Sequence, residues 1–358
     1  MMIVGVLCAI PFTALAADET LDRTLGTMLI FGVKGHELHV GNPVLKALEQ
    51  GRIGGIIIYE KSNIRNREQL AEFCQNIQKS ARGGAFIMID QEGGVVNRLK
   101  EKYGFPSFPS HQNLADMTEN EHGTSSLFKT VSKAMQTMHE VGINMNLAPV
   151  VDVNINQDSP AIGHYGRSFG ESPDQVVTNA EAFIRASEQE GVIPVIKHFP
   201  GHGSAIADSH NGLTDISKTW QADNELKPYR DLFKRGYKGG VLVGHLFVKQ
   251  LDDQYPVSLS KKIVQNLLRR KMGWNGLVIS DAYRMSAITK HYTIEQIMEN
   301  SINAGIDLLL FANDYSDEYI EKLYGIFHEL VDSGRISKKA VRDAGKRIEV
   351  AKRTYKIK

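Results

Sequence analysis

A short segment near the middle of the chain gathers more reactive side chains than any other part of it. The segment reads Lys197-His198-Phe199-Pro200-Gly201-His202-Gly203 and is soon followed by Asp208-Ser209-His210. Proline and glycine interrupt a helix, so we expect these groups on an irregular loop. Histidine changes its charge near neutral pH, and an acid two residues before it can orient its ring. The pair Asp208 and His210 therefore predicts proton transfer.

Length, composition and net charge limit the possible folds and partners of the chain. The chain has 358 residues, of which 42% are hydrophobic and 23% charged, so it can bury a full core as one large α/β barrel or as two domains. The formal net charge of +1 gives no electrostatic reason to expect a nucleic-acid partner or an anionic membrane surface.

The first residues have the pattern of an export signal. An apolar run at 3–10 is followed by Pro11 and the small-residue sequence Ala14-Leu15-Ala16, which is typical of a cleavage site. We therefore expect residues 1–16 to be a signal peptide and the mature protein, 17–358, to be periplasmic or secreted, although no Lys or Arg follows Met1-Met2. The apolar run is shorter than the roughly 20 residues of a spanning helix, so no stable membrane span is expected after cleavage.

Apolar runs alternate with helical segments along the rest of the chain, which is typical of parallel β/α units. The predicted strands are 27–33, 53–59, 85–90, 143–153, 192–199, 239–248, 276–281 and 305–311. Eight alternations favour an α/β fold of the (β/α)₈ TIM-barrel type in a single domain over a doubly wound sheet, which commonly has five or six strands.

Three segments between or after the predicted strands are distinctive. A helix is predicted to begin at the Ser172 cap with Pro173 in its first position and to stop before Gly191. A basic amphipathic helix is predicted at about 337–356. The long connection at about 100–140 is predicted to be an insertion over the active face.

In such a barrel, polar residues at the carboxyl ends of the strands converge on one pocket. The residues predicted there are Asp90, Arg98, Asp152, Arg167, Lys197, His198, His245 and Asp281, and the run after Asp90 continues with Gln91 and Glu92, to which no role is assigned. Some have a purely structural alternative, because Asp152 also fits a helix cap or a barrel ion pair and His245 fits a hydrogen-bonded core histidine.

This set of groups suits attack on an uncharged, hydroxyl-rich substrate such as a sugar. Retaining glycoside hydrolysis needs a carboxylate nucleophile and a proton donor beside the leaving oxygen. Asp281 ends an apolar strand and suits the first role. His210, backed by Asp208, suits the second, although most such enzymes use two carboxylates.

Several motifs resemble those of glycoside hydrolase family 3, and in particular its single-domain bacterial β-N-acetylglucosaminidases. They are IDQEGG, NLAPVVDVN, GRSFG, KHFPGHG with DSH, and ISD with a nearby methionine, in the family's order over essentially the whole predicted mature chain. The resemblance implies a retaining exo-hydrolase that acts on oligosaccharides, with no metal and no other cofactor, and we expect a monomer. It implies the roles given above for Asp281, His210 and Asp208. It also implies sugar binding by Asp90, Arg98, Arg167, Lys197 and His198.

The sequence departs from the family pattern at two places and leaves alternatives open. Ala282 follows Asp281 where a second acid is common, and Ser204 stands where an acid is usual, but neither change removes a reacting group. Two-domain β-glucosidases and β-xylosidases of the family take their acid from a second domain, which this sequence does not include, so an N-acetylglucosaminidase is favoured. A catalytically inactive periplasmic glycan-binding protein is the other alternative.

Two mechanistic alternatives are less well supported. A metal-dependent barrel hydrolase would use as ligands His198, His202, His210 and Asp281, but the paired histidines usual after the first strand are missing and only His36 lies nearby. A substrate-assisted mechanism would need adjacent Asp and Glu residues at a strand end, where Asp152-Val153 stands instead.

Overall fold

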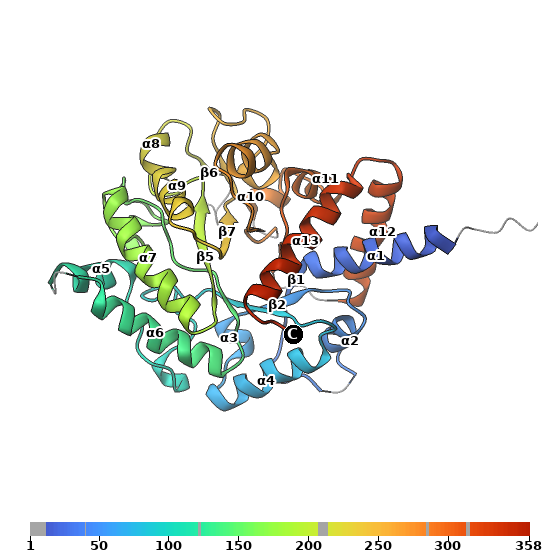
Figure 1. The fold of residues 1–358 in the computed structure, drawn as a ribbon, viewed down its shortest axis with the longest axis horizontal. Helices are drawn as coiled ribbons and strands as arrows, with labels where there is room; N and C mark the ends of the chain where they lie inside the picture. The colour runs from blue at the N-terminus through green and yellow to red at the C-terminus, as the bar shows by residue number, and fades with distance from the viewer. Residues whose placement is uncertain (1–11, 40, 121–122, 207–213, 284–285, 313–315) are drawn as a thin grey trace, which may run out of the picture.

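The computed structural model describes residues 12–39, 41–120, 123–206, 214–283, 286–312 and 316–358, with the backbone alone for residues 12–19, 286 and 287. Eight parallel strands form the centre of the molecule (Figure 1). They are β1 (Leu29–Gly32), β2 (Gly55–Ile58), β3 (Phe86–Ile89), β4 (Met145–Asn146), β5 (Ile193–Phe199), β7 (Gly240–Val243), β9 (Leu277–Ser280) and β10 (Leu309–Phe311).

The strands close into a barrel. Their order is β10-β1-β2-β3-β4-β5-β7-β9, and the two ends meet because the amide of Ser280 donates to Leu308 (3.0 Å) and that of Asp307 to Val278 (2.8 Å). Every residue of the eight strands is buried. The predicted (β/α)₈ barrel is therefore confirmed.

The strands are shorter than the apolar runs that predicted them. The run at 143–153 contains only the two-residue strand β4, after which Leu147 still donates to Ile89 (2.8 Å). Beyond β4 the main chain stays hydrogen-bonded to β5, because the amides of Val195 and Lys197 donate to Ala148 (2.9 Å) and Pro149 (3.3 Å). A single bridge between Val150 and Lys197 follows, and Asp152 comes directly after this paired segment.

Helices surround the barrel. They are α1 (Phe12–Met28), α2 (Pro43–Glu49), α3 (Glu60–Asn63), α4 (Arg67–Ser80), α5 (His111–Asn120), α6 (Ser125–Glu140), α7 (Pro173–Gln189), α8 (Ala222–Glu225), α9 (Lys227–Lys234), the π-helix η5 (Lys262–Lys271), α10 (Ser286–Thr289), α11 (Ile294–Ala304), α12 (Asp317–Asp332) and α13 (Lys338–Thr354). The Ser172 side chain accepts from the amide of Gln175 at the start of α7, as the predicted cap requires. None of the described helices is long and apolar enough to cross a bilayer.

The connection at 100–140 is not an insertion over the active face as a whole. Its second half forms α6, which packs against α7 in the outer layer of helices (Figure 1). The reason is that α6 is amphipathic and buries one apolar face, formed by Leu127, Val131, Ala134, Met135 and Met138. A helix with such a face is stable only against the barrel wall.

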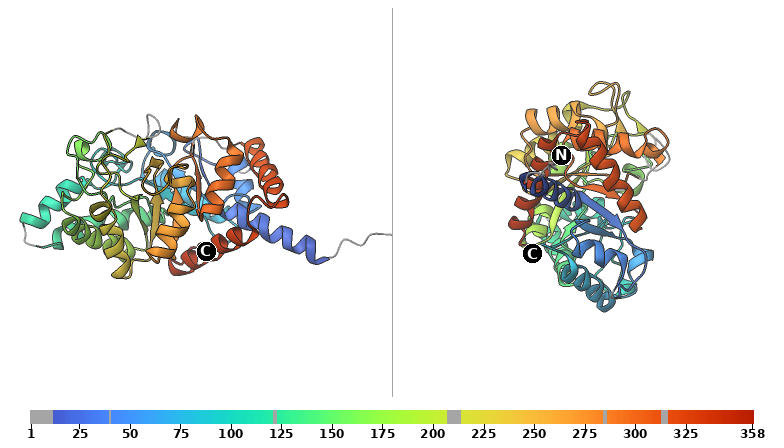
Figure 2. Two further views of the ribbon diagram at one scale, coloured as in Figure 1. Left: turned by 90° about the horizontal axis from the view of Figure 1, so that it is seen from above. Right: turned by 90° about the vertical axis from the view of Figure 1, so that its right-hand side faces the viewer.

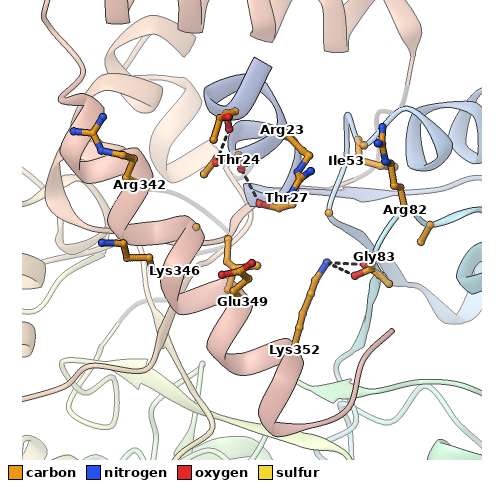
Figure 3. Close-up of a pocket in the computed structure, with 17 residues that line it drawn as sticks. Arg23, Thr24, Thr27, Ile53, Arg82, Gly83, Arg342, Lys346, Glu349 and Lys352 are labelled. Atoms are coloured by element: carbon orange, nitrogen blue, oxygen red, sulfur yellow. Dashed lines mark hydrogen bonds between the residues drawn. The ribbon is translucent and has the colours of Figure 1, made fainter. Parts of the chain in front are cut away.

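Helices α1 and α13 lie side by side at the end of the barrel where the strands begin (Figure 2). A cavity of about 440 Å³ lies between them, next to residues that precede β1, β2 and β3, namely Thr27, Gly54 and Gly84. Lys352 of α13 crosses it and donates to the carbonyls of Gly83 (3.2 Å) and Gly84 (2.6 Å) (Figure 3). This lysine ties the last helix to the turn before β3.

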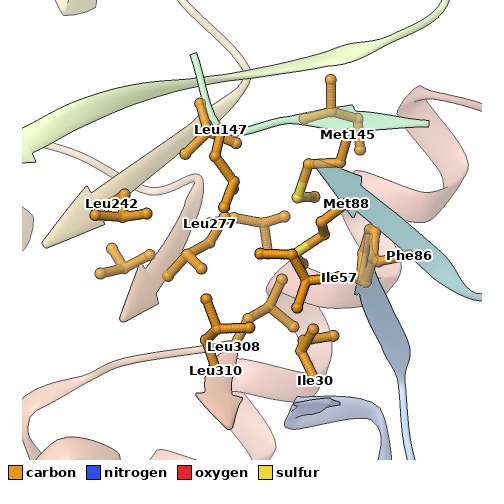
Figure 4. Packing of buried hydrophobic residues seen from close by; sticks show 14 of the residues in the cluster. Ile30, Ile57, Phe86, Met88, Met145, Leu147, Leu242, Leu277, Leu308 and Leu310 are labelled. Carbon is orange, nitrogen blue, oxygen red and sulfur yellow. The ribbon is translucent and has the colours of Figure 1, made fainter. Parts of the chain in front are cut away.

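Inside the barrel, apolar side chains from all sides fill the space (Figure 4). Ile30, Met88, Met145, Leu277 and Leu308 are each fully buried or nearly so. The barrel is thus a packed core and not a channel.

A buried ion cluster fastens the strand-start end of the barrel. The side chain of Asp307 accepts from Arg269 Nη2 (2.7 Å), from Arg347 Nε (2.8 Å) and from the amide of Val278 (2.8 Å). It joins η5, α13 and β9 to the segment before β10, and it is completely buried.

We predict that Asp307→Ala lowers the free energy of unfolding by about 3–5 kcal/mol, because it leaves the buried Arg269 without its carboxylate. Urea denaturation measures this loss. Glu299→Ala is the matched control, since it breaks the more exposed pair with Arg335 and should cost at most about 1 kcal/mol. Equal losses in the two variants would contradict the structural role given to Asp307.

Candidate active site

A cavity of about 310 Å³ opens at the carboxyl ends of the strands. Leu147, Leu242 and Leu310, which belong to the packed interior of the barrel, form its apolar floor (Figure 4). Polar groups from the end of β5 and from the loops after the other strands complete the lining: Tyr59, Asp90, Glu92, Arg98, Arg167, Lys197, His198 and Asp281. An apolar floor with a few converging polar groups is typical of a small-molecule site.

A buried carboxylate organises the positive charges of this cavity. Glu92 accepts two hydrogen bonds from Arg167 (both 2.8 Å), and its Oε1 lies 2.6 Å from the ammonium of Lys197. Burial alone would raise the pKa of Glu92, but the charges of Arg167 and Lys197 hold it well below its usual range. Lys197 also donates to Asp90 (2.8 Å), so groups from the loops after β3 and β4 and from β5 itself are locked together.

A second buried carboxylate fixes the histidine-rich loop. Asp152 accepts from the amides of His198 (3.0 Å) and His202 (2.9 Å), and its Oδ2 lies 2.7 Å from Nδ1 of His198. Burial alone would raise the pKa of Asp152, but His198 lowers it through charge and hydrogen bonding. An ionised Asp152 can only accept, so Nδ1 of His198 donates and its Nε2 is left to face the cavity near Arg167 Nη2 (3.5 Å).

Asp281 stands directly after β9 and lines the cavity. The amide of Ala282 donates to its Oδ1 (2.8 Å). Tyr59 lines the same cavity, and burial together with the charges of Asp90 and Asp281 raises the pKa of its hydroxyl, so this hydroxyl stays neutral and able to donate.

The structure brings together six of the residues that the sequence singles out: Asp90, Arg98, Arg167, Lys197, His198 and Asp281 all line this cavity. Their roles in binding or catalysis stay predictions. Asp208 and His210 fall in 207–213, which is outside the described residues.

Two other predicted pocket residues are placed in supporting positions. Asp152 lies beneath the loop and does not line the cavity. His245 is fully buried, with Nδ1 2.7 Å from Ser258 Oγ and Nε2 3.1 Å from the carbonyl of Ala282, so it is the hydrogen-bonded core histidine of the alternative interpretation.

Sequence reasoning included Glu92 in the strand-end run after Asp90 but gave it no role, and it missed Tyr59 as a cavity residue. The alternation of side chains at the end of a strand places Glu92 on the same side as Asp90, so the signal for Glu92 was present in the sequence.

In the part of the chain that is described, no three His, Cys, Asp or Glu side chains form a group suited to a metal ion.

Comparison with known proteins agrees with this geometry. A beta-hexosaminidase from Actinobacillus pleuropneumoniae serotype 3 is 31% identical over 290 residues, which cover 80% of this chain and 81% of that protein. A beta-hexosaminidase from Haemophilus influenzae is 30% identical over 288 residues, which cover 80% and 79% of the two chains.

Solved structures show the same fold. A family 3 β-N-acetylglucosaminidase from Paenibacillus sp. str. FPU-7 superposes with a TM-score of 0.85 at 29% identity, over 94% of this chain, and this chain spans only 63% of the length of that one. A family 3 glycosyl hydrolase from Mycobacterium smegmatis superposes with a TM-score of 0.78 at 28% identity, over 92% of this chain and 96% of that one.

A closed parallel barrel whose strand ends present carboxylates and cations around one cavity defines a TIM-barrel protein with its site at the carboxyl end of the strands. The model of the glycosyl hydrolase family 3 N terminal domain matches residues 20–351. The chain therefore belongs to this family and is a glycoside hydrolase.

One further carboxyl group lies against the histidine-rich loop. Glu225, at the end of α8, is buried, and a Cβ added to Gly201 would come within 2.3 Å of its Oε2. Trp220 Nε1 also donates to this loop, at the carbonyl of Pro200 (3.2 Å). Burial raises the pKa of Glu225 to about 8, the nearby Ser204 hydroxyl opposes this shift, and the charge of Asp152 adds to it. The loop is thus held between Asp152 on one side and a neutral carboxyl on the other.

We predict that the stability of the protein falls between about pH 4.5 and pH 8 because of Glu225. In that range the unfolded chain releases the proton of this carboxyl while the folded chain keeps it, so folding becomes less favourable as the pH rises. Glu225→Gln should flatten this part of the profile, by about 1.4 kcal/mol for each pH unit over which the difference acts. Urea denaturation at a series of pH values measures the change.

Glu329→Gln, on the exposed surface of α12, is the control and should leave the wild-type profile unchanged. If Glu225→Gln and the wild type lost stability in parallel from pH 5 to pH 8, the carboxyl would be ionised in the folded protein and this assignment would be wrong.

Proposed function

We propose that the protein is a retaining exo-β-N-acetylglucosaminidase. It removes terminal, non-reducing β-linked N-acetylglucosamine from peptidoglycan fragments or chitin-type oligosaccharides through a covalent glycosyl-aspartate intermediate. The similarity to the beta-hexosaminidases and to the Paenibacillus β-N-acetylglucosaminidase supports the substrate class. The position of Asp281 in the cavity is the observation that carries the mechanism.

Asp281 is the proposed nucleophile. Its carboxylate stands at the carboxyl end of β9 in a cavity with an apolar floor, and the Ala282 amide fixes Oδ1. The backbone thus orients the carboxylate, which in the proposed first step attacks the anomeric carbon. The glycosyl–oxygen bond forms as the bond to the leaving group breaks.

His210 is the proposed proton donor and Asp208 its partner. In the first step the imidazolium gives its proton to the leaving oxygen, and in the second the imidazole takes a proton from the water that attacks the glycosyl-aspartate. The loop that leads to these residues is fixed at His198 and His202 by Asp152, which supports their delivery to the cavity.

Asp90, Arg98, Arg167, Lys197 and His198 are the proposed sugar-binding residues. The ion pairs among Asp90, Glu92, Arg167 and Lys197 hold donors and acceptors in fixed positions before a sugar arrives. Hydroxyl groups are then recognised by oriented charges without the entropy cost of ordering long side chains.

Cell location is part of the proposal. The signal-like pattern at 1–16 supports export, which would place the enzyme in the periplasm or outside the cell, where it meets cell-wall or chitin-type fragments.

We predict that the enzyme hydrolyses an aryl β-N-acetylglucosaminide much faster than the matching aryl glucoside and aryl xyloside. A chromogenic assay with the three substrates measures kcat/KM. Faster hydrolysis of the glucoside or the xyloside would favour the β-glucosidase or β-xylosidase alternative, and no turnover of any would favour a glycan-binding protein.

Asp281→Asn is the control for this assay. It keeps the shape of the side chain but removes the nucleophilic charge, so turnover should fall by at least about 10³-fold while the melting temperature stays close to that of the wild type. Appreciable residual turnover would exclude Asp281 as nucleophile.

We predict that His210→Ala reduces turnover far more for poor leaving groups than for activated ones. An activated nitrophenolate leaves without a proton, whereas a sugar hydroxyl needs one. The rate of intermediate formation should therefore fall about 10²–10⁴-fold with a disaccharide and only slightly with the activated aryl substrate. Pre-steady-state bursts separate formation from hydrolysis of the intermediate. Equal losses in the first step for both substrates would contradict the role of His210.

A further inference from the structure

Three of the most exposed large apolar side chains of the described residues lie on loops at the carboxyl end of the barrel. Over the described residues four such side chains stand out, namely Val95 (57% exposed), Tyr165 (46%), Ile206 (72%) and Val350 (53%). The first three lie on the loops after β3, β4 and β5, at the carboxyl end of the barrel. We call these three residues the rim patch.

The rim patch is close in sequence to the cavity lining, and contacts connect the loops that carry it. Val95 directly precedes the lining residue Val96, and Tyr165 lies two residues before the lining residue Arg167. The neighbouring glycines Gly94 and Gly166 both pass beside Ser110, since a Cβ added to them would lie 2.7 Å and 3.5 Å from its side chain. The loops that carry Val95 and Tyr165 are therefore adjacent.

The third residue is tied to the same loop system. The carbonyl of Ala205, just before Ile206, accepts from the Asn156 side chain (3.0 Å), and the amide of Asn156 donates to Gly203 (3.1 Å). Asn156 lies on the loop after β4 that continues to Tyr165. The rim patch thus follows one arc of the barrel mouth over three successive loops.

Tyr165 is held in place by local structure. It ends the short 3₁₀ helix η2 (Gly163–Tyr165), its ring lies edge-on to that of His164 at 4.8 Å, and Gly166 follows with a φ of 60°. The carbonyl of Gly166 accepts from the amide of Gln112 (3.1 Å), which fixes the turn to α5. An exposed aromatic ring on a fixed turn is a preformed surface for an apolar face.

The size of the cavity determines what this surface can meet. A volume of about 310 Å³ is at the low end for ligand sites and suits one sugar residue. An exo-acting enzyme places the terminal sugar inside, so the leaving group must lie outside the cavity, against the loops at its mouth.

We propose that the rim patch binds the leaving-group sugar of the substrate, with the Tyr165 ring stacked on the apolar face of that second sugar. This inference rests on the proposed function, because it assigns the second sugar of the same substrate. The rim patch then favours oligosaccharides over simple glycosides.

The test separates binding at the rim from catalysis. Calorimetry measures the affinity of N,N'-diacetylchitobiose and of N-acetylglucosamine for Asp281→Asn protein, which cannot consume the disaccharide, with and without Tyr165→Ala. Loss of the ring should weaken disaccharide binding about fivefold to tenfold and leave monosaccharide binding unchanged. Tyr165→Phe, which keeps the ring, and Val350→Ala, at the other end of the barrel, should bind both sugars as the parent does.

The other outcomes decide against the rim assignment, against the proposed function, or against both. If Tyr165→Ala weakens the binding of both sugars, or of neither, a role in binding the second sugar is contradicted. If the wild type without sugar sediments as an oligomer and Tyr165→Ala dissociates that oligomer, the rim patch is instead a contact between copies of the chain. If the wild type turned over no N-acetylglucosaminide but the selective loss of disaccharide binding persisted, the proposed function would fail while the rim assignment stood. No binding of either sugar would remove both.

Discussion

The charge of Glu92 is the constraint on which the arrangement of the cavity depends. A carboxylate this deeply buried is tolerated only because Arg167 and Lys197 contact both of its oxygens, and these two cations are in turn fixed by it. They come from the loop after β4 and from β5, while Glu92 follows β3. Three neighbouring strands must therefore be in register before the ion pairs can form. The stability of the folded barrel offsets the desolvation free energy of these buried charges. The result is a polar surface that needs little rearrangement to receive a sugar.

The two ends of the barrel have different tasks. At the end where the strands begin, Asp307 with its two arginines and Lys352 with the turn before β3 fasten the outer helices to the core. At the opposite end, the carboxyl groups face a cavity or lie beneath the histidine-rich loop. The packed interior separates the two, so changes in the loops at the mouth leave the helix–strand contacts of the other end intact.

The fold was predictable because the eight apolar runs and the polar residues that follow them repeat with the period of β/α units. Six cavity residues were predictable for the same reason, since parallel strands place their carboxyl ends together. Periodicity does not predict where each carboxylate points. Asp152 and Glu92 follow similar strands, yet Asp152 lies beneath the loop and Glu92 lines the cavity. Glu225 was not predictable either, because its burial depends on the close approach of Gly201 from a different segment. The start of β4 and the outer position of α6 likewise depend on tertiary packing.

The hydrogen bond from the Ala282 amide to Asp281 has a consequence for substitutions at position 282. A main-chain donor is present with every residue except proline, so alanine at position 282 orients the carboxylate as well as an acid would. The path of the backbone at this turn therefore sets the carboxylate, and a substitution at position 282 can change what surrounds the ligand without turning Asp281.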